Sequence, residues 1–191
     1  MVRLLFLALA LLLAGCDSRP QFGSADISQA DYARDFALTD HTGKPRTLAD
    51  FRGKVVVIFF GYTQCPDVCP TTLTGMAEAM KLLGADAAKV QVLFVSVDPE
   101  RDTQELLAQY VPVFNPSFLG LYADAQTIAR TAQDFRVFYK KQPGSTPTTY
   151  TVDHTAGSYV YDPQGRLRLY IKHGEKPEVI AKDLKQLVAG K

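Results

Sequence analysis

The sequence contains no tryptophan, only three cysteines and three histidines, and almost no net charge. Its 21 lysines and arginines are matched by 20 aspartates and glutamates, for a formal net charge of +1. A chain without a basic excess has no general electrostatic attraction for polyanions, so we do not expect nucleic acid as a partner. Hydrophobic residues make up 47% of the chain and charged residues 21%. These proportions predict one packed domain of ordinary size.

The N-terminal hydrophobic run is too short for a permanent membrane span. Leu4 to Leu13 is unbroken and apolar, and Arg3 is the only charge in the first fifteen residues. A helix needs about 20 apolar residues to cross the hydrocarbon core, and this run has half that number. A short apolar run behind one positive charge is instead typical of an export signal.

The export signal ends in small residues followed by a cysteine. Leu13-Ala14-Gly15-Cys16 resembles the lipobox of bacterial lipoproteins, in which the cysteine becomes the acylated first residue of the mature chain. We therefore predict a lipoprotein signal peptide over 1–15 and lipidation of Cys16, against the alternative of a plain secretory signal with an incidental cysteine. Asp17 resembles the signal that retains such lipoproteins at the inner membrane of Gram-negative bacteria.

The rest of the chain predicts a tether and one α/β domain. Residues 16–34 are mostly polar and without periodicity, as expected for a lipidated cysteine and a flexible tether, and the domain is expected over 35–191. Two β-branched runs predict buried parallel strands joined by a helix with an apolar stripe. The expected elements are strands at 54–60 and 89–97, helices at 70–83, 103–113, 124–135 and 177–187, and a hairpin at 158–171.

This order of elements predicts a mixed sheet with helices on both faces. It is a thioredoxin-like plan with an N-terminal extension and an inserted loop, from about 137 to 153, before the final hairpin.

Cys65 and Cys69 lie between a predicted central strand and a predicted helix, at the sheet edge where α/β proteins place their sites. The positive end of a helix lowers a cysteine pKa, so we expect both thiols to ionise near neutral pH. Redox motifs of the thioredoxin type have two residues between their cysteines. The three residues here favour metal binding, although Pro66 and Pro70 disturb helical geometry and leave a disulfide possible.

A metal held by two thiolates needs a further ligand. Thiolates select Cu(I), zinc or related soft ions, and neither zinc nor Cu(II) is satisfied by two sulfurs alone. Among the three histidines, His41 and His173 are expected at the surface. His154 ends the inserted loop, where a thioredoxin-like sheet brings its cis-proline loop beside the active cysteines. The alternative for His154 is a capping or core residue.

Several segments together resemble the Sco/SenC family of copper chaperones for cytochrome c oxidase. They are Asp35-Phe36-x-Leu38-x-Asp40-x-x-Gly43, Asp50-Phe51-x-Gly53-Lys54, Phe60-Gly61-Tyr62-Thr63-x-Cys65-Pro66-Asp67-Val68-Cys69-Pro70, Val95-Ser96-Val97-Asp98-Pro99-x-Arg101-Asp102-Thr103 and Asp153-His154. The resemblance implies that Cys65, Cys69 and His154 bind one copper ion per chain, as Cu(I), Cu(II) or both.

Charged residues near these ligands are candidates for supporting roles. Asp98, Arg101 and Asp102 follow the second parallel strand and either support the site or form a helix cap and a surface salt bridge. Asp153 is a candidate to orient the His154 ring, through its backbone or its carboxylate. Asp67 either tunes the charge of the site or is a solvated loop residue. We expect Tyr62 to serve packing.

The resemblance implies a periplasmic, membrane-anchored chaperone that delivers copper to the dinuclear copper A site of cytochrome c oxidase. The expected partners are the oxidase subunit that carries this site, other periplasmic copper carriers, and the membrane through the lipid anchor. The expected location is the bacterial cell envelope, at the periplasmic face of the inner membrane. The main alternative is a thiol-disulfide oxidoreductase that keeps the oxidase cysteines reduced, with Cys65 and Cys69 as its catalytic pair. A peroxiredoxin-like peroxidase fits the local motif poorly.

Overall fold

The computed structural model describes residues 20–146 and 149–191. The predicted signal peptide, the lipidation of Cys16 and the role of Asp17 therefore lie outside the described residues. Within the described part of the chain, no helix is both long and apolar enough to cross a membrane.

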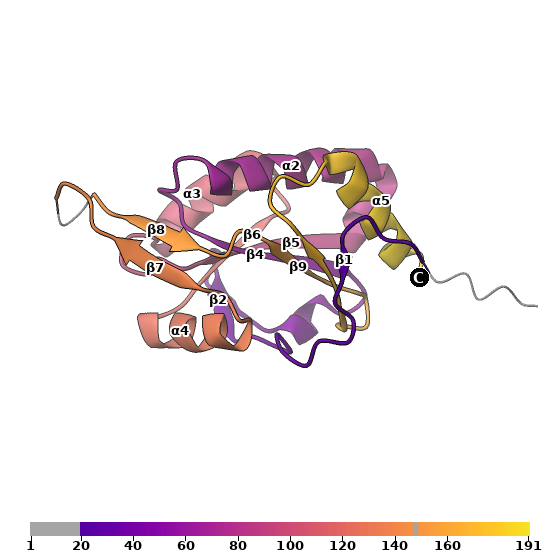
Figure 1. Ribbon diagram of the computed structural model, residues 1–191, viewed down its shortest axis with the longest axis horizontal. Coiled ribbons are helices and arrows are strands. Elements are labelled where there is room, and N and C mark those ends of the chain that lie inside the picture. The colour runs from indigo at the N-terminus through magenta and orange to yellow at the C-terminus, as the bar shows by residue number, and fades with distance from the viewer. Residues whose placement is uncertain (1–19, 147–148) are drawn as a thin grey trace, which may run out of the picture.

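The described strands form one mixed sheet and a separate two-stranded ribbon (Figure 1). The sheet has eight strands in the order β1-β10-β9-β4-β5-β6-β2-β3, and β7 pairs with β8 to form the ribbon. The strands are β1 Ala25–Asp26, β2 Leu38–Asp40, β3 Pro45–Arg46, β4 Val55–Gly61, β5 Val90–Ser96, β6 Leu119–Tyr122, β7 Tyr139–Gln142, β8 Thr151–His154, β9 Ser158–Tyr161 and β10 Leu167–Ile171.

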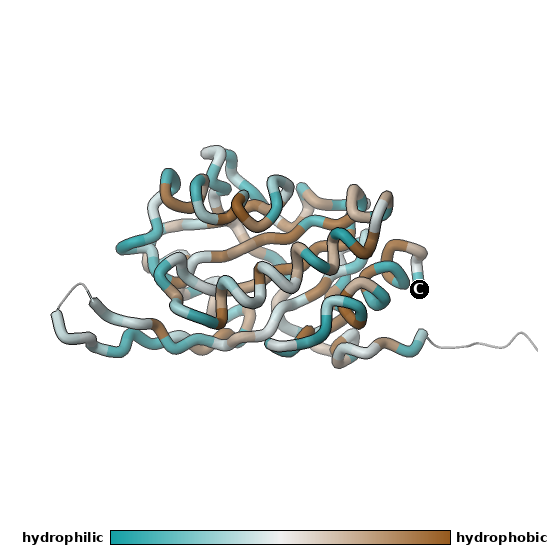
Figure 2. Tube along the Cα trace, turned by 90° about the horizontal axis from the view of Figure 1, so that it is seen from above, coloured by the Kyte–Doolittle hydropathy of each residue, from teal (hydrophilic) through white to brown (hydrophobic). Residues whose placement is uncertain are grey.

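The centre of the sheet is parallel and fully buried. Strand β4 pairs with β5 from Val55↔Val90 to Gly61↔Ser96, and β5 pairs in parallel with β6, whereas β9 runs antiparallel to β4. Every residue of β4 and β5 is buried, as their β-branched and aromatic composition predicts for strands covered on both faces. Figure 2 shows the hydrophobic residues concentrated along these central strands.

Helices cover both faces of the sheet. Figure 1 shows α2, α3 and α5 on one face and α4 on the other. In α2 the predicted stripe of Leu73, Met76, Ala77, Met80 and Leu83 is buried, because residues three and four apart lie on one side of a helix. The helices are η2 Leu48–Phe51, α2 Val68–Leu83, η3 Gly84–Lys89, α3 Gln104–Phe114, α4 Ala125–Asp134 and α5 Pro177–Val188. The predicted thioredoxin-like α/β plan is confirmed.

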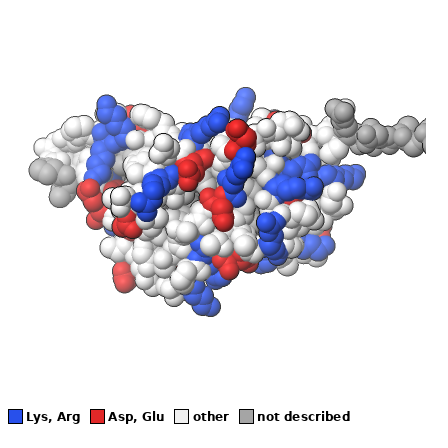
Figure 3. Space-filling view, turned by 90° about the horizontal axis from the view of Figure 1, so that it is seen from below, with Lys and Arg blue, Asp and Glu red and all other residues white. Residues whose placement is uncertain are grey.

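Charges of both signs are mixed on the surface. On the face in Figure 3, lysines and arginines lie among aspartates and glutamates, with uncharged surface between them. This distribution agrees with a net charge of +1.

The packed chain begins earlier than Asp35. The backbone N–H groups of Gly23 and Ser24 donate hydrogen bonds to the Asp183 carboxylate on α5, at 2.9 and 2.8 Å. Strand β1 pairs with β10, and Ala33 is buried. The part of the predicted tether that the structure describes therefore packs against the domain instead of forming a free linker.

Two further local predictions were wrong. The inserted segment before the final hairpin is the β7–β8 ribbon instead of a loop, and the described residues, to which Pro147 does not belong, contain no cis peptide bond. Helix α3 is capped by Thr103, whose hydroxyl accepts a hydrogen bond from the Leu106 N–H at 3.2 Å. Asp102, the predicted cap, points into the protein instead.

Candidate metal centre

The cysteine segment joins the end of β4 to the start of α2. Cys65 lies in the connecting turn and is partly exposed, whereas Cys69 lies in the first turn of α2 and is buried. Pro70 follows Cys69 in this first turn, where the backbone N–H that proline lacks would have no hydrogen-bond partner within the helix. The strand-to-helix connection therefore presents one sulfur at the surface and one beneath it.

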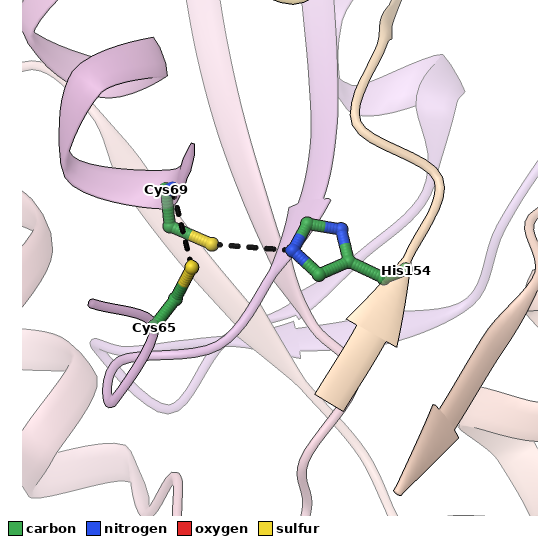
Figure 4. Close-up of side chains that lie close together, drawn as sticks. All are labelled: Cys65, Cys69 and His154. Carbon is green, nitrogen blue, oxygen red and sulfur yellow. Dashed lines mark hydrogen bonds between the residues drawn. The ribbon is translucent and has the colours of Figure 1, made fainter. Parts of the chain in front are cut away.

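Two sulfurs and one imidazole nitrogen meet at this point (Figure 4). Cys69 Sγ lies 3.4 Å from His154 Nε2, and the Cys69 N–H donates a hydrogen bond to Cys65 Sγ at 3.4 Å. The three candidate ligand atoms all lie within 4.8 Å of one another, and both thiols are free. Segments 85 residues apart in the sequence thus bring the predicted ligands together.

The orientation of the His154 ring is fixed by its backbone surroundings. Nδ1 lies 3.0 Å from the Thr155 carbonyl oxygen, and because a carbonyl can only accept, Nδ1 carries the proton. The neutral ring therefore turns the lone pair of Nε2 toward Cys69. The rings of Phe59 and Tyr62 each meet the imidazole edge-on, with centroids 5.9 Å apart. Tyr62 thus packs as predicted, directly against a candidate ligand.

Burial dominates the electrostatics of the site. It raises the pKa of the Cys69 thiol well above its ordinary value, against the predicted decrease, because the cost of burying a thiolate exceeds the effect of the helix N-terminus. Burial also lowers the pKa of His154, so its imidazole is neutral at neutral pH. The metal-free site is thus a protonated Cys69 thiol beside an unprotonated Nε2.

The three groups fit one soft metal ion. Bonds of roughly 2.3 Å to sulfur and 2.0 Å to nitrogen separate neighbouring ligand atoms by about 3.5 to 4 Å. The observed separations of up to 4.8 Å are close to this range. Two thiolates with one imidazole suit copper or zinc in preference to magnesium or calcium, which take oxygen ligands. Neutral His154 needs no proton removed before it binds.

The site opens to the surface through a hollow of about 470 Å³. Cys65 and His154 both line it, so an ion or a small partner group reaches them from solvent. The lining residues are Tyr62, Cys65, Pro66, Asp67, Val68, Thr151, Val152, Asp153 and His154.

Asp102 and Asp98 are buried and support the site indirectly. Asp102 is 2% exposed, and its carboxylate accepts hydrogen bonds from the Thr63 hydroxyl at 2.6 Å and the Ser96 hydroxyl at 2.6 Å. It thereby fastens the cysteine segment to the end of β5. Asp98 is fully buried, and its carboxylate accepts hydrogen bonds from Arg101 Nε and from the Tyr150 hydroxyl. The alternative of a surface salt bridge is therefore wrong for this pair.

The other two acidic candidates do not contact the ligands. Asp67 is exposed at the start of α2 and accepts a hydrogen bond from the Thr71 hydroxyl at 3.1 Å. The Asp153 carboxylate accepts one from Gln142 across the ribbon, because successive residues of β8 point to opposite sides. The predicted orientation of His154 by Asp153 was wrong, since the Thr155 carbonyl performs this role.

The other two histidines are not among the three candidate ligands, although the charge of His173 acts to lower the pKa of His154. His41 follows β2, is partly buried, and accepts a hydrogen bond from the Gly120 N–H at Nδ1. The prediction that His41 is a surface residue was therefore wrong. His173 is exposed as predicted, and its Nδ1 lies 3.0 Å from the Thr72 hydroxyl.

Sequence reasoning missed two residues beside the site. Tyr150, just before β8, contacts both Asp98 and Arg101. A Cβ at Gly61 would lie 2.8 Å from Cys69 Sγ, so only glycine at the end of β4 leaves room for that sulfur. A glycine in a buried apolar strand is a signal of such close approach. No comparable signal marks Tyr150.

The family model described as SCO1/SenC matches residues 24–189. The chain belongs to the SCO1/SenC family. It is similar to Protein SCO2 homolog, mitochondrial, of Mus musculus, with 38% identity over 81% of this chain and 62% of that protein. It also resembles the structure of Bradyrhizobium japonicum ScoI with copper bound, with 44% identity, a TM-score of 0.74, and coverage of 80% of this chain and 97% of the other.

A second solved relative is the apo Sco1 protein from Thermus thermophilus. It is 41% identical, has a TM-score of 0.78, and the alignment covers 89% of this chain and 99% of that one. The chain therefore resembles SCO1/SenC proteins solved both with and without copper. It spans about three fifths of the length of the mitochondrial relatives it matches.

Proposed function

We propose that this SCO1/SenC protein carries one copper ion, bound by Cys65, Cys69 and His154, as cargo for another protein. The observation that carries the proposal is the convergence of two sulfurs and one imidazole nitrogen within 4.8 Å. The likeness to a ScoI structure solved with copper favours copper over zinc. Two thiolates suit Cu(I), and the imidazole makes Cu(II) tolerable, so the ion can be held in both states.

We further propose that the recipient is the dinuclear copper A site of cytochrome c oxidase, carried by one oxidase subunit. The family resemblance supports this choice. A site open through a hollow at the surface, with Cys65 partly exposed, allows a partner's ligands to replace this protein's ligands one at a time. Other periplasmic copper carriers would load the site by the same exchange.

The proposed location is the periplasmic face of the inner membrane of a bacterium, with a lipid anchor at Cys16. The small residues Ala14 and Gly15 before this cysteine support the anchor, and Asp17 supports retention at the inner membrane. The anchor is tested by growing bacteria that produce the protein with a labelled fatty acid. The label should enter the native protein and be lost in Cys16→Ser, and an unlabelled native protein would refute the anchor.

A copper titration of the purified, reduced full-length protein tests the metal function. We expect one copper per chain, with a sulfur-to-Cu(II) charge-transfer band in absorption and a nitrogen-coupled signal in spin resonance. Loss of the band in Cys65→Ala and Cys69→Ala would locate the sulfur ligands, and His41→Ala, remote from the site, should keep it. A protein that binds no copper would contradict the proposal.

A second candidate function is thiol-disulfide exchange. It is favoured by the pairing of a partly exposed Cys65 with a buried Cys69, whose N–H donates to Cys65 Sγ. The Cys65 thiolate would attack a partner disulfide and release one partner sulfur as a thiolate. Cys69 would lose its proton and displace the second, leaving a Cys65–Cys69 disulfide and a reduced partner. His154→Ala separates the two functions, since exchange should survive while the nitrogen-coupled Cu(II) signal is lost.

A further inference from the structure

The guanidinium of Arg101 lies where three chain segments meet. Its Nε donates to the Asp98 carboxylate on the segment after β5, and its Nη1 donates to Gln64 Oε1 at 3.1 Å and to the Tyr150 carbonyl at 2.9 Å. Gln64 directly precedes Cys65, and Tyr150 directly precedes β8, the strand that ends at His154. One side chain thus touches both segments that carry the candidate ligands.

The contact with Tyr150 closes a ring of three side chains. The Arg101 guanidinium lies over the Tyr150 ring, with Cζ 3.5 Å from the centroid, and the Tyr150 hydroxyl donates to the second oxygen of Asp98 at 2.7 Å. Asp98 is fully buried and the Arg101 side chain is 13% exposed. A buried charge pair with stacking and several hydrogen bonds holds one geometry, because breaking any contact leaves a buried charge less satisfied.

The ribbon depends on such contacts for its position. Among the described strands, β7 and β8 pair only with each other, so no ladder of sheet hydrogen bonds fixes where His154 lies. Val152 packs in the core, and Tyr150 is tied to Asp98 and Arg101. Arg101 Cζ also lies 5.7 Å from the centroid of the Tyr62 ring, which contacts the His154 imidazole edge-on.

We propose that Arg101 is a positioning residue, which ties the ribbon to the cysteine segment and so holds the His154 imidazole beside the two sulfurs. The inference rests on the proposed copper site. Without Arg101, the imidazole leaves the site part of the time. The two sulfurs, held by β4 and α2, remain. Cu(II), which needs the nitrogen, then dissociates faster, and Cu(I) binding changes little.

Arg101→Ala tests this role through the rate at which the loaded full-length protein loses Cu(II) to a chelator. Supporting residues around metal ligands change affinity by about 10–100-fold, so we expect loss at least about tenfold faster, with a weaker nitrogen coupling in spin resonance. Arg46→Ala is the matched control, because Arg46 also bonds a fully buried aspartate, Asp40, and lies over an aromatic ring, Phe51, but at the far edge of the sheet. Its rate should equal that of the native protein.

A double-substitution cycle separates positioning from general damage. If Arg101 acts only through the imidazole, Arg101→Ala should leave Cu(I) affinity unchanged in the His154→Ala protein, whose remaining ligands are the two sulfurs. A loss of Cu(I) affinity that is equally large in both backgrounds would overturn the proposal, because Arg101 would then act on the sulfurs.

Tyr150→Leu gives the same test with the arginine retained, should Arg101→Ala fail to fold. It removes both the ring under the guanidinium and the bond to Asp98, so the same faster loss of Cu(II) is expected. If this variant lost Cu(II) at the native rate and kept the native nitrogen coupling, the proposal would also be overturned. A native protein that binds no copper would instead refute the proposed function.

Discussion

The two segments that meet at the metal centre are held in different ways. The cysteine segment continues from β4, a strand buried on both faces, and Asp102 fastens it to β5 through Thr63 and Ser96. The β7–β8 ribbon pairs with no described strand of the main sheet, and side-chain contacts hold it in place. The main sheet and α2 therefore fix the positions of the two sulfurs. The imidazole lies on the ribbon, which side-chain contacts hold against the rest of the domain. We infer that the sulfurs set affinity for copper and that the imidazole sets its retention on oxidation.

The largest effect should come from removing the buried sulfur. Cys69→Ala leaves one thiolate and one imidazole, too few soft donors for either oxidation state. We expect at least about a thousandfold weaker binding of both Cu(I) and Cu(II), which corresponds to about 4 kcal/mol. Competition with a chelator of known affinity measures it. Near-native Cu(I) binding in this variant would show that Cys69 is not a ligand.

Removing the imidazole should separate the two oxidation states. In His154→Ala the sulfurs keep their places, so Cu(I) affinity should fall by no more than about 10- to 100-fold. Cu(II) should be lost or reduced by the thiols. The measurement is a pair of titrations, one anaerobic with Cu(I) and one with Cu(II), with His41→Ala as a histidine control. Equal losses for both ions would refute the division of roles between sulfurs and imidazole.

The difference between the two segments also explains what could be predicted from the sequence. Strand β4 and helix α2 were predicted within two residues at each end, because Val55 to Gly61 is continuously apolar and α2 carries a stripe at helical spacing. The ribbon was missed, because β7 is Tyr139-Lys140-Lys141-Gln142, a polar run without the alternation that marks a half-buried strand. Its pairing is made by backbone groups, which leave no such pattern.

The same contrast holds for the site: the cysteines could be predicted from the sequence, and the contacts of the ribbon could not. The spacing and position of Cys65 and Cys69 pointed to a metal centre, but His154 was chosen by elimination and by family resemblance. The contacts of Arg101 with Tyr150 join residues 49 apart and have no local pattern. The direction of the Cys69 pKa shift was wrong because it depends on depth of burial, which the sequence around a helix start does not reveal.

The pH dependence of copper binding should reflect the sulfurs before the imidazole. Because burial raises the pKa of Cys69, an incoming copper ion must displace its proton at neutral pH, and affinity should fall about tenfold per unit of decreasing pH for each proton displaced. Burial lowers the pKa of His154 below its ordinary 6.5, so protons compete for the imidazole only in more acidic solution. Anaerobic chelator competition for Cu(I) between pH 8 and 6.5 should give equal slopes for the native protein and His154→Ala. A flat profile would mean that Cys69 binds without losing a proton.

A pair of glycine substitutions tests how firmly β4 confines the buried sulfur. A Cβ at Gly61 would lie 2.8 Å from both Cys69 Sγ and Phe94 Cε2, distances that force the sulfur or the ring to move. Gly61→Ala should lower the free energy of unfolding by about 1–3 kcal/mol, as overpacking of a core does, and should weaken copper binding by displacing Cys69.

A Cβ at Gly75, within α2, would have no atom within 4 Å other than its chain neighbours and the backbone of its own helix. Gly75→Ala should therefore raise the free energy of unfolding by about 0.5–1 kcal/mol and leave copper binding unchanged. Urea unfolding of the metal-free variants, followed by chelator competition, measures both effects. If Gly61→Ala behaved like Gly75→Ala in both measurements, the end of β4 would not confine Cys69. The sulfurs would then be no more rigidly placed than the imidazole.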